Sequence, residues 1–173
     1  MTGSMKATLF PLAILLFSTT VSCAGTKVFK ISNSAMEPTV FQGESIIIAM
    51  GRFEPKRGEL IVFEHDGVLQ LKRVIGLEGD VVEGRDLQIF RNGELLKEPY
   101  IQHAGLPSNG KTLKTFSPVT VSKGELFVLG DNRDYSFDSR DRRFGKVTVQ
   151  DVQGKPLRIA RSSHSDRGGK SLE

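Results

Sequence analysis

Short β-branched runs separated by glycine and proline dominate the chain after Gly25, and they limit the folds open to it more than any other feature. Valine, isoleucine and phenylalanine favour strands, and glycine and proline interrupt them. No long window past position 26 repeats its apolar residues with the 3.6-residue period of an amphipathic helix. We expect strands at Lys27–Ile31, Ser45–Ala49, Glu59–Phe63, Val68–Ile75, Leu87–Leu96, Val119–Val121, Glu125–Leu129, Lys146–Val152 and Leu157–Ala160.

The strongest local signal is the Asn92-Gly93 pair, which lies between the two apolar halves of Leu87–Leu96. Both residue types tolerate the positive φ that a two-residue type I′ turn requires, so the pair predicts a β-hairpin. Hairpins join antiparallel strands. The sequence therefore predicts an all-β domain of antiparallel sheets, packed together or partly closed into a barrel-like form.

The chain is 173 residues long, with 38% hydrophobic and 25% charged residues, which is enough for one main domain with a buried core. We expect this β domain to span residues 26–160. Residues 105–114 are rich in Gly, Pro and Ser and predict a polar loop. Residues 161–173 have almost no apolar side chains, so we expect a flexible tail there.

An uncharged apolar segment, residues 7–21, follows Lys6 near the N-terminus. Its length is typical of a signal-peptide core and falls short of the ~20 residues that span a bilayer. Small residues and Cys23 come next, an arrangement that resembles a bacterial lipoprotein signal, in which the cysteine is lipidated. Residues 1–25 are a lipoprotein signal, an uncleaved membrane anchor or an ordinary cleaved signal. All three export the domain to the extracytoplasmic side, and the first two hold it at a membrane.

The few metal-ligating residue types exclude some site classes. One cysteine cannot form an intramolecular disulfide or a cysteine-based zinc site. The three histidines, His65, His103 and His164, are too scattered to suggest another metal site. The formal net charge of +4 is modest, and we expect no nucleic-acid partner.

Three segments depart from ordinary strand-and-turn sequence. They are residues 32–40 (SNSAMEPTV), residues 71–80 (LKRVIGLEGD) and residues 130–140 (GDNRDYSFDSR). In this order they resemble the bacterial type I signal peptidases, membrane-bound serine proteases that remove signal peptides from exported proteins. The resemblance runs over about residues 28–160. It implies the all-β, barrel-like fold of the signal-peptidase and LexA-like proteins, and a mechanism that uses a serine and a lysine.

The resemblance also implies roles for single residues. Lys72 is the general base, which takes the hydroxyl proton and returns it to the leaving amine. A base must be neutral near pH 7, and burial disfavours the charged form of a lysine. Ser136 matches the serine that orients the lysine, and Asp138 and Arg140 match a structural ion pair. The residues expected to shape the structure near the site are Met36, Pro38, Asp131, Asn132 and Arg133.

The family's nucleophilic serine stands directly before Met36, where this chain has Ala35. A methyl group cannot attack a carbonyl, so the covalent step is lost. Three explanations are open. The protein is a natural pseudoenzyme that binds without cutting, Ser34 is the nucleophile instead, or Ala35 is a deliberate inactivating substitution. In an extended strand Ser34 would face away from Lys72 unless a bulge turned it.

The oxyanion position and the ligand follow from the same resemblance. The family often uses a Ser or Thr hydroxyl two residues before the nucleophile, and here that position holds Asn33, whose amide can donate. The backbone N–H of Ala35 is the second expected donor. The implied partners are signal peptides or preproteins, bound as an added strand with small residues before the scissile bond. No metal or organic cofactor is implied.

Overall fold

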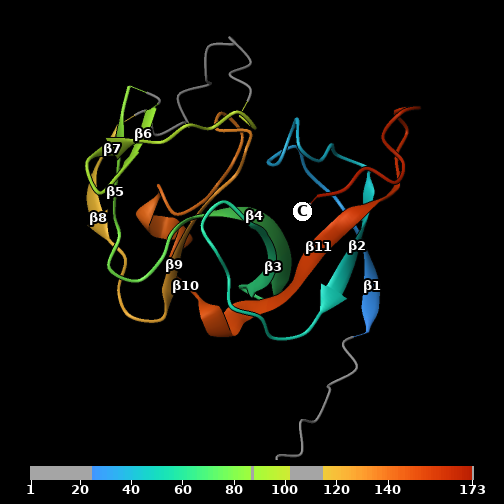
Figure 1. Cartoon of the computed structure of the whole chain (residues 1–173), viewed down its shortest axis with the longest axis horizontal. Helices are drawn as coiled ribbons and strands as arrows, with labels where there is room; N and C mark the ends of the chain where they lie inside the picture. The colour runs from blue at the N-terminus through green and yellow to red at the C-terminus, as the bar shows by residue number, and fades with distance from the viewer. Residues whose placement is uncertain (1–24, 87, 102–114, 173) are drawn as a thin grey trace, which may run out of the picture.

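The computed structural model describes residues 25–86, 88–101 and 115–172, and these form two antiparallel sheets (Figure 1). The seven-stranded sheet has the order β1 (Thr26–Lys30), β2 (Ser45–Met50), β11 (Val152–Arg161), β3 (Leu60–His65), β4 (Val68–Gly76), β9 (Glu125–Leu129), β10 (Val147–Thr148). The four-stranded sheet has the order β7 (Glu94–Leu95), β6 (Gln88–Arg91), β5 (Val81–Arg85), β8 (Phe116–Thr120). Two short 3₁₀ helices, η1 (Arg142–Phe144) and η2 (Val149–Asp151), complete the described part. The prediction of an all-β antiparallel fold is confirmed.

The core consists of three groups of buried side chains, and one of them supports the 32–40 segment. Met36 and Val40 from that segment pack with Ile46, Ile48 and other residues of the seven-stranded sheet. A second group lies between β3, β4 and β9, and a third joins the two sheets. The 32–40 segment is therefore held against the sheet by its own apolar residues. Among the described residues, no helix is long and apolar enough to span a membrane.

The predicted hairpin is present. Asn92 and Gly93 have φ of 54° and 80° between β6 and β7, as a type I′ turn requires. The Asn92 side chain also accepts a hydrogen bond from Val81 and donates one to the buried carboxylate of Asp80. The turn is thus tied to the start of β5.

Several strands differ from the expectation. β5 was not expected, and β8 begins before the expected Val119. The expected strand Lys146–Val152 is present only in part, as β10 followed by η2, and the expected Leu157–Ala160 is the second half of the longer strand β11. Gly154 and Pro156 lie inside β11, although both residue types usually interrupt strands. A Cβ at Gly154 would lie 2.5 Å from the Ala49 carbonyl oxygen, so only glycine fits there. The pairing with β2 shifts register just after Pro156.

The segment that follows β11, residues 162–172, is here called the C-terminal return. Arg167 forms an ion pair with Glu44, which is fully buried, at 2.7 Å. The Ser162 hydroxyl donates to the same carboxylate at 2.6 Å. Leu172 packs against the core group that holds the 32–40 segment. The C-terminal return therefore fixes the chain just after that segment.

These contacts correct the expectation of a flexible tail over residues 161–173 for its described part. The low apolar content suggested few contacts, but the contacts formed are mainly polar and point to a carboxylate far away in the sequence. The folded domain continues past residue 160. The predictions for residues 1–24, including lipidation of Cys23, and for the loop at 105–114 lie outside the described residues.

Candidate active site

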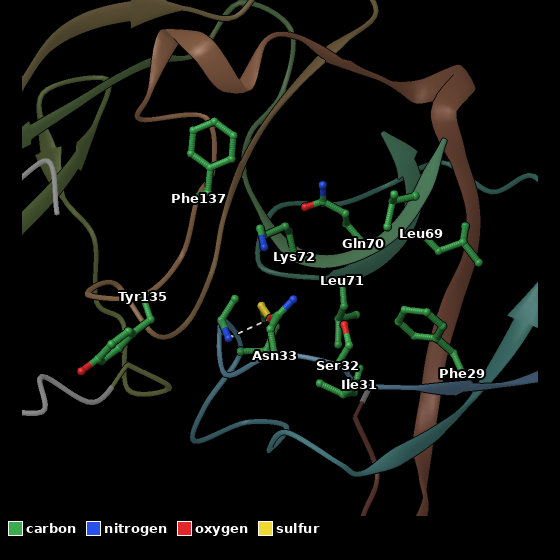
Figure 2. A pocket seen from close by; sticks show the side chains of 13 residues that line it. Phe29, Ile31, Ser32, Asn33, Leu69, Gln70, Leu71, Lys72, Tyr135 and Phe137 are labelled. Carbon is green, nitrogen blue, oxygen red and sulfur yellow. Dashed lines mark hydrogen bonds between the residues drawn. The ribbon is translucent and has the colours of Figure 1, made fainter. Parts of the chain in front are cut away.

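A groove of about 330 Å³ lies between the 32–40 segment, the first half of β4 and the 130–140 loop (Figure 2). Most of its lining residues have apolar or aromatic side chains. The lining residues are Phe29, Ile31, Ser32, Asn33, Ala35, Met36, Val68, Leu69, Gln70, Leu71, Lys72, Tyr135 and Phe137. All three segments singled out in the sequence contribute to it, so the fold brings them together.

Lys72 is the buried lysine of this groove, with 4% of its surface exposed. Its position on β4 turns its side chain to the opposite face from Arg73, and Figure 2 shows its nitrogen directed toward the turn that carries Asn33. Burial lowers the pKa of Lys72, and this outweighs the opposing effect of Asp138. A lowered pKa brings the lysine closer to the neutral form that a general base needs.

Residues 33–40 form turns and not an extended strand. The Glu37 N–H donates to the Ser34 carbonyl at 3.1 Å, and the Val40 N–H donates to the Met36 carbonyl at 3.0 Å. The strand alternation used to orient Ser34 therefore does not apply here. Within this turn Ala35 is buried and lines the groove, whereas Ser34 is half-buried and is not among the lining residues.

Asn33 and Ala35 contact each other directly. The Ala35 N–H donates to Asn33 Oδ1 at 3.1 Å, as the dashed line in Figure 2 marks. The amide of Asn33 was expected to act as a donor to the oxyanion. In the structure its oxygen accepts instead, from the very N–H expected to be the second donor. The N–H of Ala35 is thus able to hold an oxygen atom in the groove.

The 130–140 loop is tied closely to the turn at Ala35. The Asn132 N–H donates to the Ala35 carbonyl at 3.0 Å, and Asn132 Nδ2 donates to the Ser34 carbonyl at 3.1 Å. Gly130 lies between the Ala35 carbonyl and the Ser136 side chain. A Cβ on Gly130 would be 2.4 Å from the Ala35 carbonyl oxygen and 2.3 Å from Ser136 Oγ. Only glycine allows the two segments to approach this closely.

Ser136 was expected to orient Lys72. Its Oγ is buried and has no hydrogen-bond partner among the described residues. It lies beside Gly130, close to the segment that carries Ala35, and not in a bond to the lysine. A buried hydroxyl without a partner is costly and is often found at functional sites. The orienting role of Ser136 stays a prediction.

Two buried ion pairs hold the loop. Asp138 binds Arg140 through two hydrogen bonds, at 2.8 and 3.0 Å, and also accepts from the Gly130 N–H. Asp131 binds Arg73 at 2.8 and 2.5 Å. Charges taken out of water need such partners. The Asp138–Arg140 pair lies within the loop and holds its shape, and the Asp131–Arg73 pair ties the loop to β4.

A third pair was not anticipated. Arg133 binds Glu98 at 2.8 and 2.5 Å, and the Tyr100 hydroxyl donates to the same carboxylate. The guanidinium of Arg73 lies 3.9 Å from the centre of the Tyr100 ring. In the sequence Glu98–Ile101, only Glu98 is charged and only Tyr100 is aromatic. These two residue types were the one sequence feature that could have indicated a role for the segment. Their partners are far away in the sequence and could not be assigned from it.

The described domain thus combines an all-β scaffold, a buried lysine and a groove lined in part by the turn at Ala35 and by the 130–140 loop. Comparison with known proteins identifies the family of the chain. Residues 2–159 match the family model "Signal peptidase, peptidase S26", and the chain belongs to this family. The prediction of a type I signal peptidase relative is confirmed.

Individual relatives agree. Signal peptidase I V of Bacillus subtilis (strain 168) is 34% identical over 137 residues, which are 73% of this chain and 80% of that protein. Signal peptidase I of Bacillus licheniformis is 34% identical over 123 residues, 65% of each chain. The crystal structure of a signal peptidase I from Enterococcus faecalis V583 has 36% sequence identity and a TM-score of 0.52, over 61% of this chain and 98% of that one.

Proposed function

We propose that this protein binds signal-peptide segments of exported proteins as extended chains and does not cleave them. The observation that carries this proposal is Ala35, a methyl group at the nucleophile position, in the same groove as Lys72. A general base without a hydroxyl to activate cannot form an acyl intermediate. The groove, Lys72 and the Ala35 N–H are all present and can still bind a peptide.

The shape of the sheet supports binding of a strand. β4 pairs with β3 along Val68–Arg73, but its other neighbour, β9, pairs only from Arg73 onward. One edge of Val68–Lys72 is therefore without a neighbouring strand among the described residues. An extended peptide laid in the groove can pair with this edge through main-chain hydrogen bonds, while the apolar lining takes its side chains.

Ser34 is a poorer nucleophile in this geometry. Its side chain is half-buried outside the groove lining, and its carbonyl is fixed by Asn132. The hydrogen bonds within the turn at residues 33–40 and the packing of Met36 in the core oppose a rearrangement of this turn. The geometry thus favours binding over cleavage by Ser34.

The place of action follows from the N-terminal sequence. We propose that residues 1–25 export the domain and hold it at a membrane, by an apolar anchor or by a lipid on Cys23. Exported preproteins carrying signal peptides are the partners that this location supplies. Mass measurement of the mature N-terminus distinguishes a lipidated Cys23 from an uncleaved segment and from simple cleavage.

Binding and cleavage are separated by one pair of measurements. The protein and its Ser34→Ala variant are incubated at equimolar concentration with a labelled signal-peptide segment that spans the cleavage region. We expect saturable binding by both and no product from either, measured by fluorescence anisotropy and mass spectrometry. Product from the unchanged protein that the Ser34→Ala variant fails to form would make Ser34 the nucleophile and overturn the proposal. Absence of binding to the folded protein would also overturn it.

A further inference from the structure

We propose that the C-terminal return (residues 162–172) positions the turn at Ala35 for peptide binding, and that Arg167 is the positioning residue through which it acts. This inference rests on the proposed function, because it names the residue that keeps the groove in its binding shape. The return lies beyond residues 2–159, which match the family model. Arg167 is not among the residues that line the groove, so it acts through the chain that follows Ala35.

The guanidinium of Arg167 bonds two groups in that part of the chain. Its Nε donates to the fully buried carboxylate of Glu44 at 2.7 Å, and its Nη2 donates to the Thr39 carbonyl at 2.7 Å. An arginine can make both bonds at once, because its planar group directs several N–H donors along fixed directions. Arg167 therefore holds Thr39 in place relative to a carboxylate inside the fold.

The bond to the Thr39 carbonyl reaches the turn through one peptide group. The Thr39 carbonyl and the Val40 N–H belong to the same planar unit, so a bond that holds the first also holds the second. The Val40 N–H donates to the Met36 carbonyl at 3.0 Å, which closes the turn directly after Ala35. Met36 and Ala35 both line the groove. Loss of the bond to Thr39 would therefore loosen this wall of the groove.

The side chain of Thr39 connects the same residue to the other elements around the groove. The Thr39 hydroxyl donates to Asp131 of the 130–140 loop at 2.5 Å. Asp131 also binds Arg73, the neighbour of Lys72 on β4, at 2.8 and 2.5 Å. Thr39 is thus the residue at which the C-terminal return, the turn and the 130–140 loop are joined.

Ring contacts hold Arg167 against this part of the chain. The guanidinium carbon of Arg167 lies 4.5 Å from the centre of the Phe41 ring, and the centre of the His164 ring lies 4.7 Å from it. The Phe41 N–H donates to Glu44 at 2.8 Å. The guanidinium is therefore fixed by its stacking as well as by its ion pair, as a positioning role requires.

The test compares Arg167→Lys with the unchanged protein. A lysine keeps a positive charge for Glu44, but its single nitrogen cannot reproduce the arginine's fork, so we expect the bond to the Thr39 carbonyl to be lost. A labelled signal-peptide segment is titrated into each protein at pH 7 and followed by fluorescence anisotropy. We expect its Kd to rise roughly three- to tenfold, the effect of one weakened hydrogen bond.

A control variant and a second readout separate positioning from stability. Val147→Ala shortens a buried side chain in a core group that does not include the turn, so it should lower the urea midpoint and leave the Kd unchanged. Amide hydrogen exchange is measured without peptide. The Val40 amide should exchange several-fold faster in Arg167→Lys, whereas the amides of β3 should keep their rates.

Each outcome bears on the inference. Equal Kd values for Arg167→Lys and the unchanged protein would overturn it and leave the proposed function standing. An unchanged exchange rate at Val40 would show that Arg167 does not hold the turn. A rise in Kd for Val147→Ala as large as that for Arg167→Lys would attribute the effect to stability and contradict a positioning role. Failure of the folded, unchanged protein to bind the peptide would contradict the inference and the proposed function together.

Discussion

The main-chain N–H of Asn132 donates a 3.0 Å hydrogen bond to the carbonyl of Ala35. The side chain of Asn132 donates a second bond to the preceding carbonyl, at Ser34. The Ser34 carbonyl and the Ala35 N–H belong to one planar peptide group. A hydrogen bond that holds the carbonyl therefore also holds the direction of the Ala35 N–H. One residue of the 130–140 loop thus sets the geometry of the expected oxyanion donor.

Asn132→Ala should loosen this peptide. We expect a loss of about 1 kcal/mol in the free energy of unfolding, because one side-chain hydrogen bond is removed while the main-chain bond remains. Peptide affinity should fall more than stability would explain, because the Ala35 N–H is no longer held in place. Urea denaturation and anisotropy titration measure the two effects. An unchanged affinity would contradict the positioning role.

Gly130→Ala should be strongly destabilising. The added methyl group would lie 2.4 Å from the Ala35 carbonyl oxygen and 2.3 Å from Ser136 Oγ, so the two segments must move apart. Overpacking of this kind costs roughly 1–3 kcal/mol. Gly168→Ala is the matched control, because a Cβ there has no neighbour within 4 Å. Equal urea midpoints for the two variants would show that the contact at Gly130 is not tight.

Ala35→Ser should create a peptidase. The new hydroxyl would line the same groove as Lys72, and loss of a serine nucleophile costs on the order of 10⁶-fold in kcat in a serine protease. We expect cleavage of a signal-peptide segment at least ~10³-fold above the unchanged protein. Mass spectrometry of the products measures it. The Ala35→Ser/Lys72→Met double variant should be inactive, and activity in that variant would rule out the lysine as the base.

Lys72→Met should stabilise the protein near neutral pH. Burial lowers the pKa of Lys72 in the folded state, although Asp138 opposes it. Below that lowered pKa the folded state carries a disfavoured charge, and this cost disappears as the pH rises toward the unfolded value. The variant should gain about 0.5–2 kcal/mol at neutral pH, and the gain should shrink toward pH 10. A gain independent of pH would attribute the effect to packing alone.

Arg167→Met should destabilise the protein in a pH-dependent manner. Burial tends to raise the pKa of Glu44, but its hydrogen bonds to Arg167, Ser162 and the Phe41 N–H together lower it. A lowered carboxylate pKa contributes stability above its unfolded value of about 4.5, which is lost as the pH falls through the folded value. Without Arg167 the buried charge has lost its cation, and we expect a loss of about 3 kcal/mol at pH 7.

The check on Arg167→Met is a pair of melting curves for each protein, at pH 7 and pH 4. In the variant, burial without the Arg167 cation favours the neutral form of Glu44, so acid relieves the cost of its charge and the difference in Tm between the variant and the unchanged protein should narrow at pH 4. Arg143→Met is the control, because Arg143 pairs with Asp141 on the exposed surface. A difference in Tm that is the same at both pH values would show that Glu44 does not depend on Arg167.

Local signals predicted much of the fold. The Asn92-Gly93 turn was predictable because its chemistry lies within two residues. The first half of β11 was not, because Gly154 is required by the distant carbonyl of Ala49, and a glycine inside a strand usually indicates its end. The contacts of the C-terminal return were missed for a related reason: Arg167 has no local sign that it meets Glu44.

The residues that make up the candidate site were predictable, but the directions of their side chains were not. The family resemblance brought Lys72, Ala35 and the 130–140 loop to one place, and the structure has all three around the groove. Strand alternation failed at Ser34, because residues 33–40 turn instead of extending. The role of Asn33 as an acceptor depends on a side-chain rotation that no sequence pattern determines.

The packing of the C-terminal return has a practical consequence for labelling this protein. Leu172 contacts the core group that supports the turn at Ala35, so a reporter domain joined directly after it would strain the region whose binding is to be measured. A small dye at Glu94, exposed in the β6–β7 hairpin of the other sheet, avoids that contact (Figure 1). Labels for binding measurements on this protein are therefore best attached at the β6–β7 hairpin.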